Sequence, residues 1–306
     1  MLRRLRIDQG RLVECDENNG DVHVYTSPTE AERRYLVDTL KLDEHTLNSA
    51  LDPDELSRLE FEPDHVAMIF KRAKNYSSED NFVFKIASTG LFLFKDRLII
   101  VMADEAALFE GRQFVRIASL PDIILKLVYR SIFHFEEHLK VINMISTQLE
   151  QEINTAMENK HLLNLFTLEK SLVYYLNGIS SNGRLVEKMR NNAAKIGFTP
   201  ENLEFLEDIS IENTQCHELA NIYSSILAGL MDARVSIVSN NLNLLMKTLT
   251  LIMIGIMLPQ LIVSIFSMNV PLPFPGEGSQ AYFWIIMAIT VGSMGAAFAF
   301  WRWKKW

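Results

Sequence analysis

The sequence predicts an α+β domain followed by long helices and a two-helix transmembrane hairpin. Short apolar or alternating runs occupy the chain up to about residue 118, and such runs are typical of strands. From Pro121 onwards, apolar residues recur at helical spacing over long stretches. Between residues 249 and 301 the only charged side chain is Glu277, so this part of the sequence predicts membrane spans.

The first domain is predicted to cover residues 1–118. A helix start is expected at Ser27-Pro28-Thr29-Glu30, which combines a capping residue with an early proline. A second helix start is expected at Pro53, which has an aspartate on each side. No glycine-rich loop follows an expected strand, so the sequence predicts no phosphate loop for a nucleotide. The expected strands are residues 58–61, 65–72, 81–87, 91–94 and 98–102.

Charge and cysteine content restrict the partners and the compartment. The net charge is −8; Arg302, Lys304 and Lys305 contribute +3 and Glu277 contributes −1, so the part before residue 249 carries −10. A domain this acidic is a poor nucleic-acid binder, but it attracts divalent cations. Two cysteines far apart in sequence are typical of a reducing compartment. The N-terminal sequence lacks the apolar core of a signal peptide, so we expect the first domain in the cytoplasm.

Long helices are expected in the middle of the chain. Residues 119–197 are predicted to form a cytoplasmic helical hairpin, whose second helix is interrupted near Asn177-Gly178. Residues 198–268 are predicted to form one stalk helix that starts at Pro200 and has acidic residues in its first turns. A helix of about 65 residues is on the order of 100 Å long at 1.5 Å per residue. We expect this helix to continue from the cytoplasm into the membrane.

Two uncharged stretches, residues 249–268 and 281–301, each have the length that a bilayer requires. Aromatic residues flank the second stretch on both sides, as at membrane interfaces. Basic residues before the first stretch and after the second place both ends inside. We therefore expect an external loop at 269–280 and a second span with a basic tail at 281–306. The predicted location is the plasma (inner) membrane, with both termini in the cytoplasm.

A polar face with a 3.5-residue repeat runs along the predicted stalk helix. The face lacks Leu, Ile, Val and Phe, unlike a coiled-coil core, although it has the period of a left-handed supercoil. Small polar side chains suit a water-filled axis between several chains. Close helix–helix packing through serine and threonine uses the same residue types. The residues of this polar face are Asp232, Ser236, Ser239, Asn243, Met246, Thr250, Met253, Met257, Gln260, Ser264 and Ser267.

The groups on this face suit a divalent cation. The outward C-terminal end of the helix carries partial negative charge, and Asn269 adds amide oxygens directly beyond it. Asp232 adds carboxylates at the inner end. Oxygen ligands suit hard cations, and Mg²⁺ is expected to keep its water shell. Met246, Met253 and Met257 are expected to be apolar constrictions. The face predicts a cation pore formed by an oligomer.

Ser267-Met268-Asn269, at the end of the first span, resembles the Gly-Met-Asn signature of the CorA family of magnesium transporters. The resemblance covers the helical two-thirds of the chain, and the first domain agrees in kind and order. It implies a funnel-shaped homopentamer that is a channel-like transporter rather than an enzyme, with Mg²⁺ as transported and regulatory ion, Co²⁺ or Ni²⁺ as further ions, and no other cofactor. Further similar stretches are Met231-Asp232-Ala233, Ser239-Asn240, Met246-Lys247-Thr248-Leu249-Thr250, Pro259 and Glu169-Lys170-Ser171-Leu172.

The resemblance also implies roles for single residues. Asp208 is similar to a stalk aspartate that binds regulatory Mg²⁺ between subunits, with Glu79 or Asp80 of a neighbouring subunit as its expected partner. Metal at this site would hold the pore closed, because bridged carboxylates tie subunits together. Ser267, Met268 and Asn269 correspond to the selectivity mouth. The complete predicted pore lining is Asp232, Asn243, Met246, Leu249, Met253, Met257, Gln260 and Ser264.

Two other functions stay open, and the first of them arises because Ser267 replaces the family's glycine. Serine restricts the backbone but adds a hydroxyl that accepts from ion-bound water. One alternative is a membrane-anchored Mg²⁺ sensor that does not conduct. Another is proton-coupled transport of Zn²⁺ or another divalent ion on the same fold. His134 and His138, one helical turn apart, do not follow the zinc-protease order and are predicted to lie on a solvated helix face, with a metal contact as the alternative.

Overall fold

The computed structural model describes residues 1–15, 20–77, 81–155, 159–268 and 280–303, with side chains outside 152–161. The chain divides into two compact units, Met1–Met231 and Asp232–Trp306. The first unit contains the sheet and most of the long helices, and the second contains two apolar helical segments.

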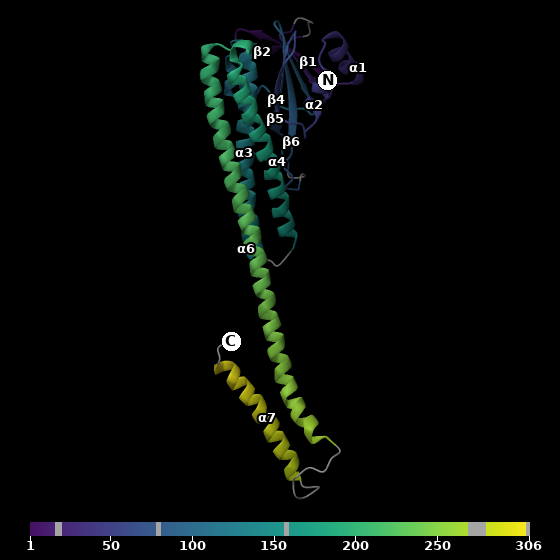
Figure 1. The fold of residues 1–306 in the computed structure, drawn as a ribbon, viewed down its shortest axis with the longest axis vertical. Coiled ribbons are helices and arrows are strands. Elements are labelled where there is room, and N and C mark those ends of the chain that lie inside the picture. The colour runs from purple at the N-terminus through teal and green to yellow at the C-terminus, as the bar shows by residue number, and fades with distance from the viewer. Residues whose placement is uncertain (16–19, 78–80, 156–158, 269–279, 304–306) are drawn as a thin grey trace. The chain divides into compact units, whose positions relative to one another are not determined.

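The first unit is organised around a seven-stranded mixed sheet (Figure 1). The strand order is β2-β1-β3-β7-β6-β5-β4. Strands β3 and β7 pair in parallel, and the other neighbouring strands pair antiparallel. The strands are β1 Leu2–Asp8, β2 Arg11–Glu14, β3 Val22–Thr26, β4 Arg58–Phe61, β5 Val66–Ala73, β6 Ile86–Leu93 and β7 Leu98–Met102.

Both faces of the sheet are buried. Met68 and Phe70 of β5 belong to a large core that includes helices α3 (Leu120–Thr155) and α4 (Asn159–Asn191). The alternate residues Ala67 and Ile69 belong to a smaller core on the other face. This alternation follows from the two-residue period of a strand. The smaller core is completed by a π-helical turn, Tyr35–Thr39, and by α2, Glu44–Leu51.

Capping side chains determine where the short helices of this layer begin. Helix α1, Glu30–Arg34, starts after Thr29, whose side chain forms a reciprocal capping box with Glu32. This confirms the helix start predicted at Ser27-Pro28-Thr29-Glu30. The start predicted at Pro53 is wrong, because α2 ends at Leu51 and a turn follows. Asp52 is the C-cap of α2, and its carboxylate accepts a hydrogen bond from the Asp54 amide at 2.9 Å.

The strands predicted at 81–87 and 91–94 are wrong in their bounds, because β6 is one continuous strand. Gly90 lies in its middle, and a Cβ at that position would be 2.5 Å from the Cβ of Ala50 in α2. The glycine therefore permits a close approach of helix to strand and does not break the strand. Strands β4 and β7 have the predicted bounds, and β5 is shifted by one residue. Strands β1, β2 and β3 were not predicted from the sequence.

A 3₁₀ turn, Arg112–Val115, precedes α3, and a short helix α5, Ala193–Ile196, follows α4. Helix α4 is continuous through Gly178, so the interruption predicted there is wrong. A Cβ at Gly178 would lie 3.5 Å from the Lys71 Cβ and 3.5 Å from the Phe135 ring. The absent side chain lets α4 pack closely against β5 and α3.

Helix α6 runs without interruption from Pro200 to Phe266, which confirms the predicted single long helix. Pro259 lies inside it and removes one backbone donor. Helix α7, Gln280–Trp303, contains the second predicted span. Helix α6 therefore belongs to both units, and the second unit consists of its C-terminal half and α7.

A buried amide joins α4 to the sheet where β4 is too short to pair. Strand β4 starts at Arg58, which pairs with Ile69 of β5, so Lys71 of β5 has no partner residue on β4. The Asn182 Oδ1 accepts from the Lys71 N–H at 2.8 Å, and its Nδ2 donates to the Lys71 carbonyl at 2.8 Å. The Ser57 hydroxyl donates to the same Oδ1 at 2.9 Å. Asn182 is fully buried and takes the place of a missing strand residue.

Candidate functional site

The predicted pore lining lies on α6 within the second unit. Every one of these side chains is exposed in the single chain, including the apolar residues Met246, Met253 and Met257. Leu249 is one residue away from the 3.5-residue repeat and is also exposed. Exposed methionines would gain by contact with a neighbouring chain or with lipid, because apolar side chains of this size are stabilised by removal from water. The residues placed on this helix are Asp232, Asn243, Met246, Leu249, Met253, Met257, Gln260 and Ser264.

Hydroxyl groups along the polar face donate to the helix itself. The Ser236 Oγ donates to the Asp232 carbonyl at 3.0 Å, and the Thr250 Oγ1 donates to the Met246 carbonyl at 2.8 Å. A hydroxyl that has committed its proton in this way keeps its oxygen lone pairs. These oxygens accept from water that a cation polarises, but they do not donate to an anion.

Ser267 directly follows the C-terminal end of α6 and continues its hydrogen bonding. Its N–H donates to the Val263 carbonyl at 3.0 Å, and its hydroxyl donates to the Ser264 carbonyl at 2.9 Å. Ser267 is not among the described residues that have positive φ, so serine is accommodated here without strain. Met268 is exposed, and Asn269 lies outside the described residues. The backbone at Ser267 has no requirement for glycine in this conformation.

The cytoplasmic metal candidate Asp208 lies on α6 in the first unit and is exposed. Its charge and that of Glu212 contribute to raising the pKa of the Tyr129 phenol, although burial of the phenol is the larger cause. Glu79 and Asp80 lie outside the described residues. Within the described chain, no three acidic, histidine or cysteine side chains converge on a metal-binding position. A metal held at Asp208 therefore needs ligands from a neighbouring subunit or from outside the described residues.

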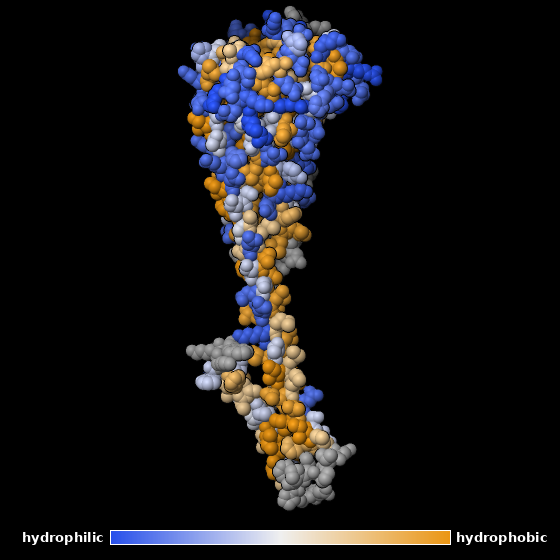
Figure 2. Space-filling view, viewed as in Figure 1, coloured by the Kyte–Doolittle hydropathy of each residue, from blue (hydrophilic) through white to orange (hydrophobic). Residues whose placement is uncertain are grey.

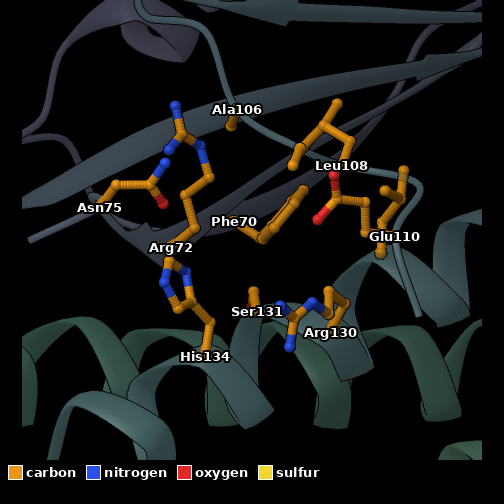
Figure 3. A pocket seen from close by; sticks show the side chains of 11 residues that line it. Phe70, Arg72, Asn75, Ala106, Leu108, Glu110, Arg130, Ser131 and His134 are labelled. Carbon is orange, nitrogen blue, oxygen red and sulfur yellow. The ribbon is translucent and has the colours of Figure 1, made fainter.

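The prediction that His134 and His138 lie on a solvated face is wrong. His138 is buried, and its Nδ1 lies 2.7 Å from the Tyr175 hydroxyl. His134 lines a cavity of about 160 Å³ together with Arg72 and Arg130 (Figure 3). The pKa of both imidazoles is lowered to about 4, chiefly by burial, and the charges of Arg130 and Arg72 contribute to the lowering at His134. Adjacent guanidinium groups repel a metal ion, so this pair is part of the core and not a metal site.

Two helices, α6 and α7, are long and apolar enough to cross a membrane. Their most apolar windows have mean hydropathies of 2.3 and 1.9. Thr290 is the one buried residue of α7, and the described part of α6 from residue 249 onwards has none. Figure 2 shows apolar residues dominating the surface of the described second unit, whereas hydrophilic residues are frequent on the first. The soluble-core alternative requires such helices to be buried, and they are not.

The model of the CorA-like Mg²⁺ transporter protein family matches residues 23–302. The chain belongs to the CorA family. Members are transporters, so the chain is a membrane transporter and not an enzyme, with two candidate spans near its C-terminus. The family assignment agrees with the resemblance that the Ser-Met-Asn motif and its companion stretches indicated.

Two comparisons place the whole chain within the CorA fold. The "Cobalt/magnesium transport protein CorA" of Methanocaldococcus jannaschii is 22% identical over 280 residues, which cover 86% of this chain and 84% of that protein. The complete structure of the CorA magnesium transporter from the same organism has a TM-score of 0.81 at 20% identity and covers 98% of this chain and 96% of that one.

Two further structures share the CorA fold at lower identity. The full-length CmaX protein has a TM-score of 0.73 at 14% identity and covers 100% of this chain and 97% of that one. The ZntB cytoplasmic domain from Vibrio parahaemolyticus has a TM-score of 0.60 at 14% identity, covering 78% of this chain and 98% of that one. These likenesses show the fold alone.

Proposed function

We propose that this chain forms a homopentamer in the plasma (inner) membrane and conducts divalent cations, chiefly Mg²⁺, with Co²⁺ and Ni²⁺ as further ions. The observation that carries the proposal is the polar face of α6, which keeps a 3.5-residue repeat over five heptads without a branched aliphatic or phenyl side chain. One such helix cannot enclose a pore, so several copies must line it. Both termini are placed in the cytoplasm by the basic residues that flank the spans.

The proposed ion path uses the α6 residues in order. Asp232 provides a ring of carboxylates at the cytoplasmic end, and Asn243 adds amide groups above it. Met246, Leu249, Met253 and Met257 form apolar rings that close the path by excluding water. Gln260 and Ser264 follow towards the outside. The Ser267-Met268-Asn269 mouth holds a hydrated Mg²⁺ through its water shell, because Mg²⁺ loses water reluctantly.

Regulation is assigned to Asp208. A Mg²⁺ ion between Asp208 of one subunit and Glu79 or Asp80 of the next would neutralise carboxylates that otherwise repel each other. High cytoplasmic Mg²⁺ would thus favour the closed arrangement, because the ion binds that arrangement more tightly. The name of the M. jannaschii relative supports Mg²⁺ and Co²⁺ as the transported ions.

Flux into liposomes tests the pore. The full-length protein is reconstituted with a Mg²⁺-sensitive dye inside and an inward Mg²⁺ gradient, and we expect voltage-dependent uptake. Asn269→Ala should reduce Mg²⁺ uptake by more than tenfold. The control Asn240→Ala removes an amide from the same chain at a position off the polar face and should leave uptake unchanged. Uptake that follows a pH gradient instead of the voltage would favour proton-coupled transport.

The sensor alternative would be favoured if the parent protein showed no Mg²⁺ flux and the variant Ser267→Gly did. Ser267 continues the hydrogen bonding of α6 to Val263 and Ser264 without positive φ, so we expect Ser267→Gly to change flux by less than about threefold. Asp208→Asn should keep the channel open at Mg²⁺ concentrations that close the parent. Glu218→Gln, an exposed acidic residue of the same helix, is the matched control. An unchanged Mg²⁺ response of Asp208→Asn removes this residue from the regulatory site.

A further inference from the structure

The segment that leads into β6 has a strained backbone. Asn81 and Phe82 both have positive φ, 48° and 67°. In this left-handed region the Cβ crowds the following carbonyl oxygen, and the conformation is rarest for bulky side chains such as phenylalanine. Residues held in this way persist only where the surrounding structure fixes them, and they cluster at functional sites. Two consecutive left-handed residues before β6 therefore need contacts that hold them.

Ser171 of α4 provides one such contact. The Phe84 N–H donates to the Ser171 Oγ at 3.1 Å, and the Phe82 carbonyl oxygen lies 3.5 Å from the same Oγ. The Ser171 hydroxyl donates to the Thr167 carbonyl at 2.8 Å, which leaves its oxygen lone pairs for the Phe84 amide. Ser171 is only 3% exposed, so water does not replace the hydroxyl. A buried hydrogen bond therefore joins the segment before β6 to α4.

The Phe84 ring anchors the same segment a second time. It stacks on the Tyr76 ring at a centroid distance of 4.1 Å, and it meets the Tyr175 ring of α4 edge-on at 6.2 Å. Aromatic pairs in these arrangements are favourable beyond the area that they bury. Tyr76 follows β5 and Phe84 precedes β6, so the stack joins the two ends of the connection between these strands.

Helix α4 also contacts α6 close to Asp208. The Asn213 Nδ2 donates to the Ile179 carbonyl of α4 at 3.2 Å, and Asn213 is buried. Arg190 of α4 pairs at 3.2 Å with Glu207, the residue before Asp208. One helix therefore supports both the segment before β6 and the part of α6 that contains Asp208. In a ring of identical copies, the spacing between these two supports determines which surfaces of neighbouring chains meet.

We propose that Ser171 is a positioning residue of the regulatory ion site. The inference rests on the proposed function, because it takes Glu79 or Asp80 as the partner of Asp208. Both acidic residues lie outside the described part of the chain and directly precede Asn81 in sequence. A bond that fixes the segment on α4 limits the positions that these carboxylates can reach. Ion binding then favours the arrangement in which the segment is bonded to α4.

Inhibition of flux by Mg²⁺ tests the proposal. The full-length protein is reconstituted in liposomes that contain calcein and graded Mg²⁺ concentrations, and Co²⁺ uptake is followed by quenching of the dye. We expect Ser171→Ala to raise the Mg²⁺ concentration that halves uptake about tenfold, because one buried hydrogen bond is lost.

Ser181→Ala is the matched control, because it removes the same kind of bond from the same helix. The Ser57 N–H donates to the buried Ser181 Oγ at 2.6 Å. This variant should lower Tm about as much as Ser171→Ala does. Its halving Mg²⁺ concentration should stay within about twofold of the parent's, because Ser57 belongs to a different connection. A general loss of stability therefore does not produce the expected difference between the two variants.

Hydrogen exchange of the parent protein gives a second measurement, which does not depend on the folding of either serine variant. Mg²⁺ should slow the exchange of the Phe84 amide at least about fivefold, because the ion favours the bonded arrangement. The Ser57 amide, which donates to Ser181, should keep its exchange rate. In Asp208→Asn the effect of Mg²⁺ on the Phe84 amide should disappear.

The outcomes separate this inference from the proposed function. Equal halving concentrations for Ser171→Ala and Ser181→Ala overturn the role of Ser171 and leave the proposed regulation intact. The same holds if Mg²⁺ inhibits the parent's flux without changing the exchange of the Phe84 amide. A parent whose flux and Phe84 exchange both ignore Mg²⁺ refutes the regulation and this inference together. A parent without flux, whose Phe84 exchange still slows in Mg²⁺, supports Ser171 and refutes only conduction.

Discussion

The buried Asn182 amide gives a sharp test of how α4 is joined to the sheet. In the variant Asn182→Ala the Lys71 N–H and carbonyl both lose their partner, while the Ser57 hydroxyl is free to rotate to another acceptor. The position is fully buried, so water does not replace the amide without opening the structure. The variant therefore leaves two backbone groups unsatisfied.

The magnitude follows from these two groups. Each buried unsatisfied group costs about 1–3 kcal/mol, so the variant should lose on the order of 3 kcal/mol of unfolding free energy. For a domain of 150–250 residues, 1 kcal/mol shifts Tm by roughly 2–4 °C. We therefore expect Tm of the first unit to fall by at least about 5 °C.

Thermal unfolding of the full-length protein in detergent, followed by circular dichroism, measures this change. Hydrogen exchange provides a local readout, because the Lys71 amide should exchange faster while the amides of β7 keep their protection. Asn221→Ala is the control, since this exposed amide lies 3.4 Å from His217 and is accessible to water. A Tm shift for Asn182→Ala that equals the control's, with unchanged exchange at Lys71, would refute the reasoning.

Three further predictions concern the first unit. Burial is the main reason why the pKa of His134 and that of His138 are lowered from 6.5 to about 4. Between these pH values the unfolded chain binds more protons than the folded chain, so Tm should fall as the pH drops from 6.5 to 4. A Tm that does not change over this pH range would contradict the prediction. Burial raises the pKa of the Cys216 thiol to about 12, so maleimide at pH 7.5 should label one thiol per folded chain, Cys15, and two after denaturation; two labels on the folded chain would be inconsistent with a buried Cys216. Gly90→Ala should lower Tm through an overlap with Ala50 that costs about 1–3 kcal/mol, and the second change Ala50→Gly should restore part of the loss; no rescue in the double variant would mean that the overlap is not the cause.

Local rules account for the elements that the sequence predicted correctly. The bounds of β4 and β7 follow from short alternating or apolar runs, and the start of α1 follows from Thr29 and Glu32. The length of α6 follows from the sparse glycine and proline between Pro200 and Pro259. These signals lie within a few residues of the structure that they determine, so they are readable without the fold.

The breaks predicted at two glycines are wrong, because tertiary contacts determine what these glycines do. Gly90 and Gly178 read as breaks along the chain, but both permit another element to approach closely. The partner in each case is distant in sequence, Ala50 for Gly90 and Lys71 for Gly178. A local pattern contains no information about such a partner.

The candidate site was predictable to a different extent in its two parts. The polar face of α6 follows from one period along one helix, so its residues were predictable, although their role in conduction stays a prediction. The burial of His138 of α3 depends on Tyr175 of α4, which is distant in sequence. The apolar spacing of Leu168, Leu172 and Tyr175 was the signal for a buried tyrosine, but the sequence alone does not pair it with a histidine.

Pro259 gives α6 a point of low bending stiffness. Because proline has no N–H, the Gly255 carbonyl one turn earlier lacks its helical donor, and Gly255 has no side chain to stiffen the turn. This position lies eight residues before Ser267, close to the C-terminal end of the helix. When the N-terminal part of α6 moves, we therefore expect the helix to bend at Pro259, so that its last two turns tilt relative to the rest. The last two turns of α6 can therefore change direction while the remaining backbone hydrogen bonds of the helix stay intact.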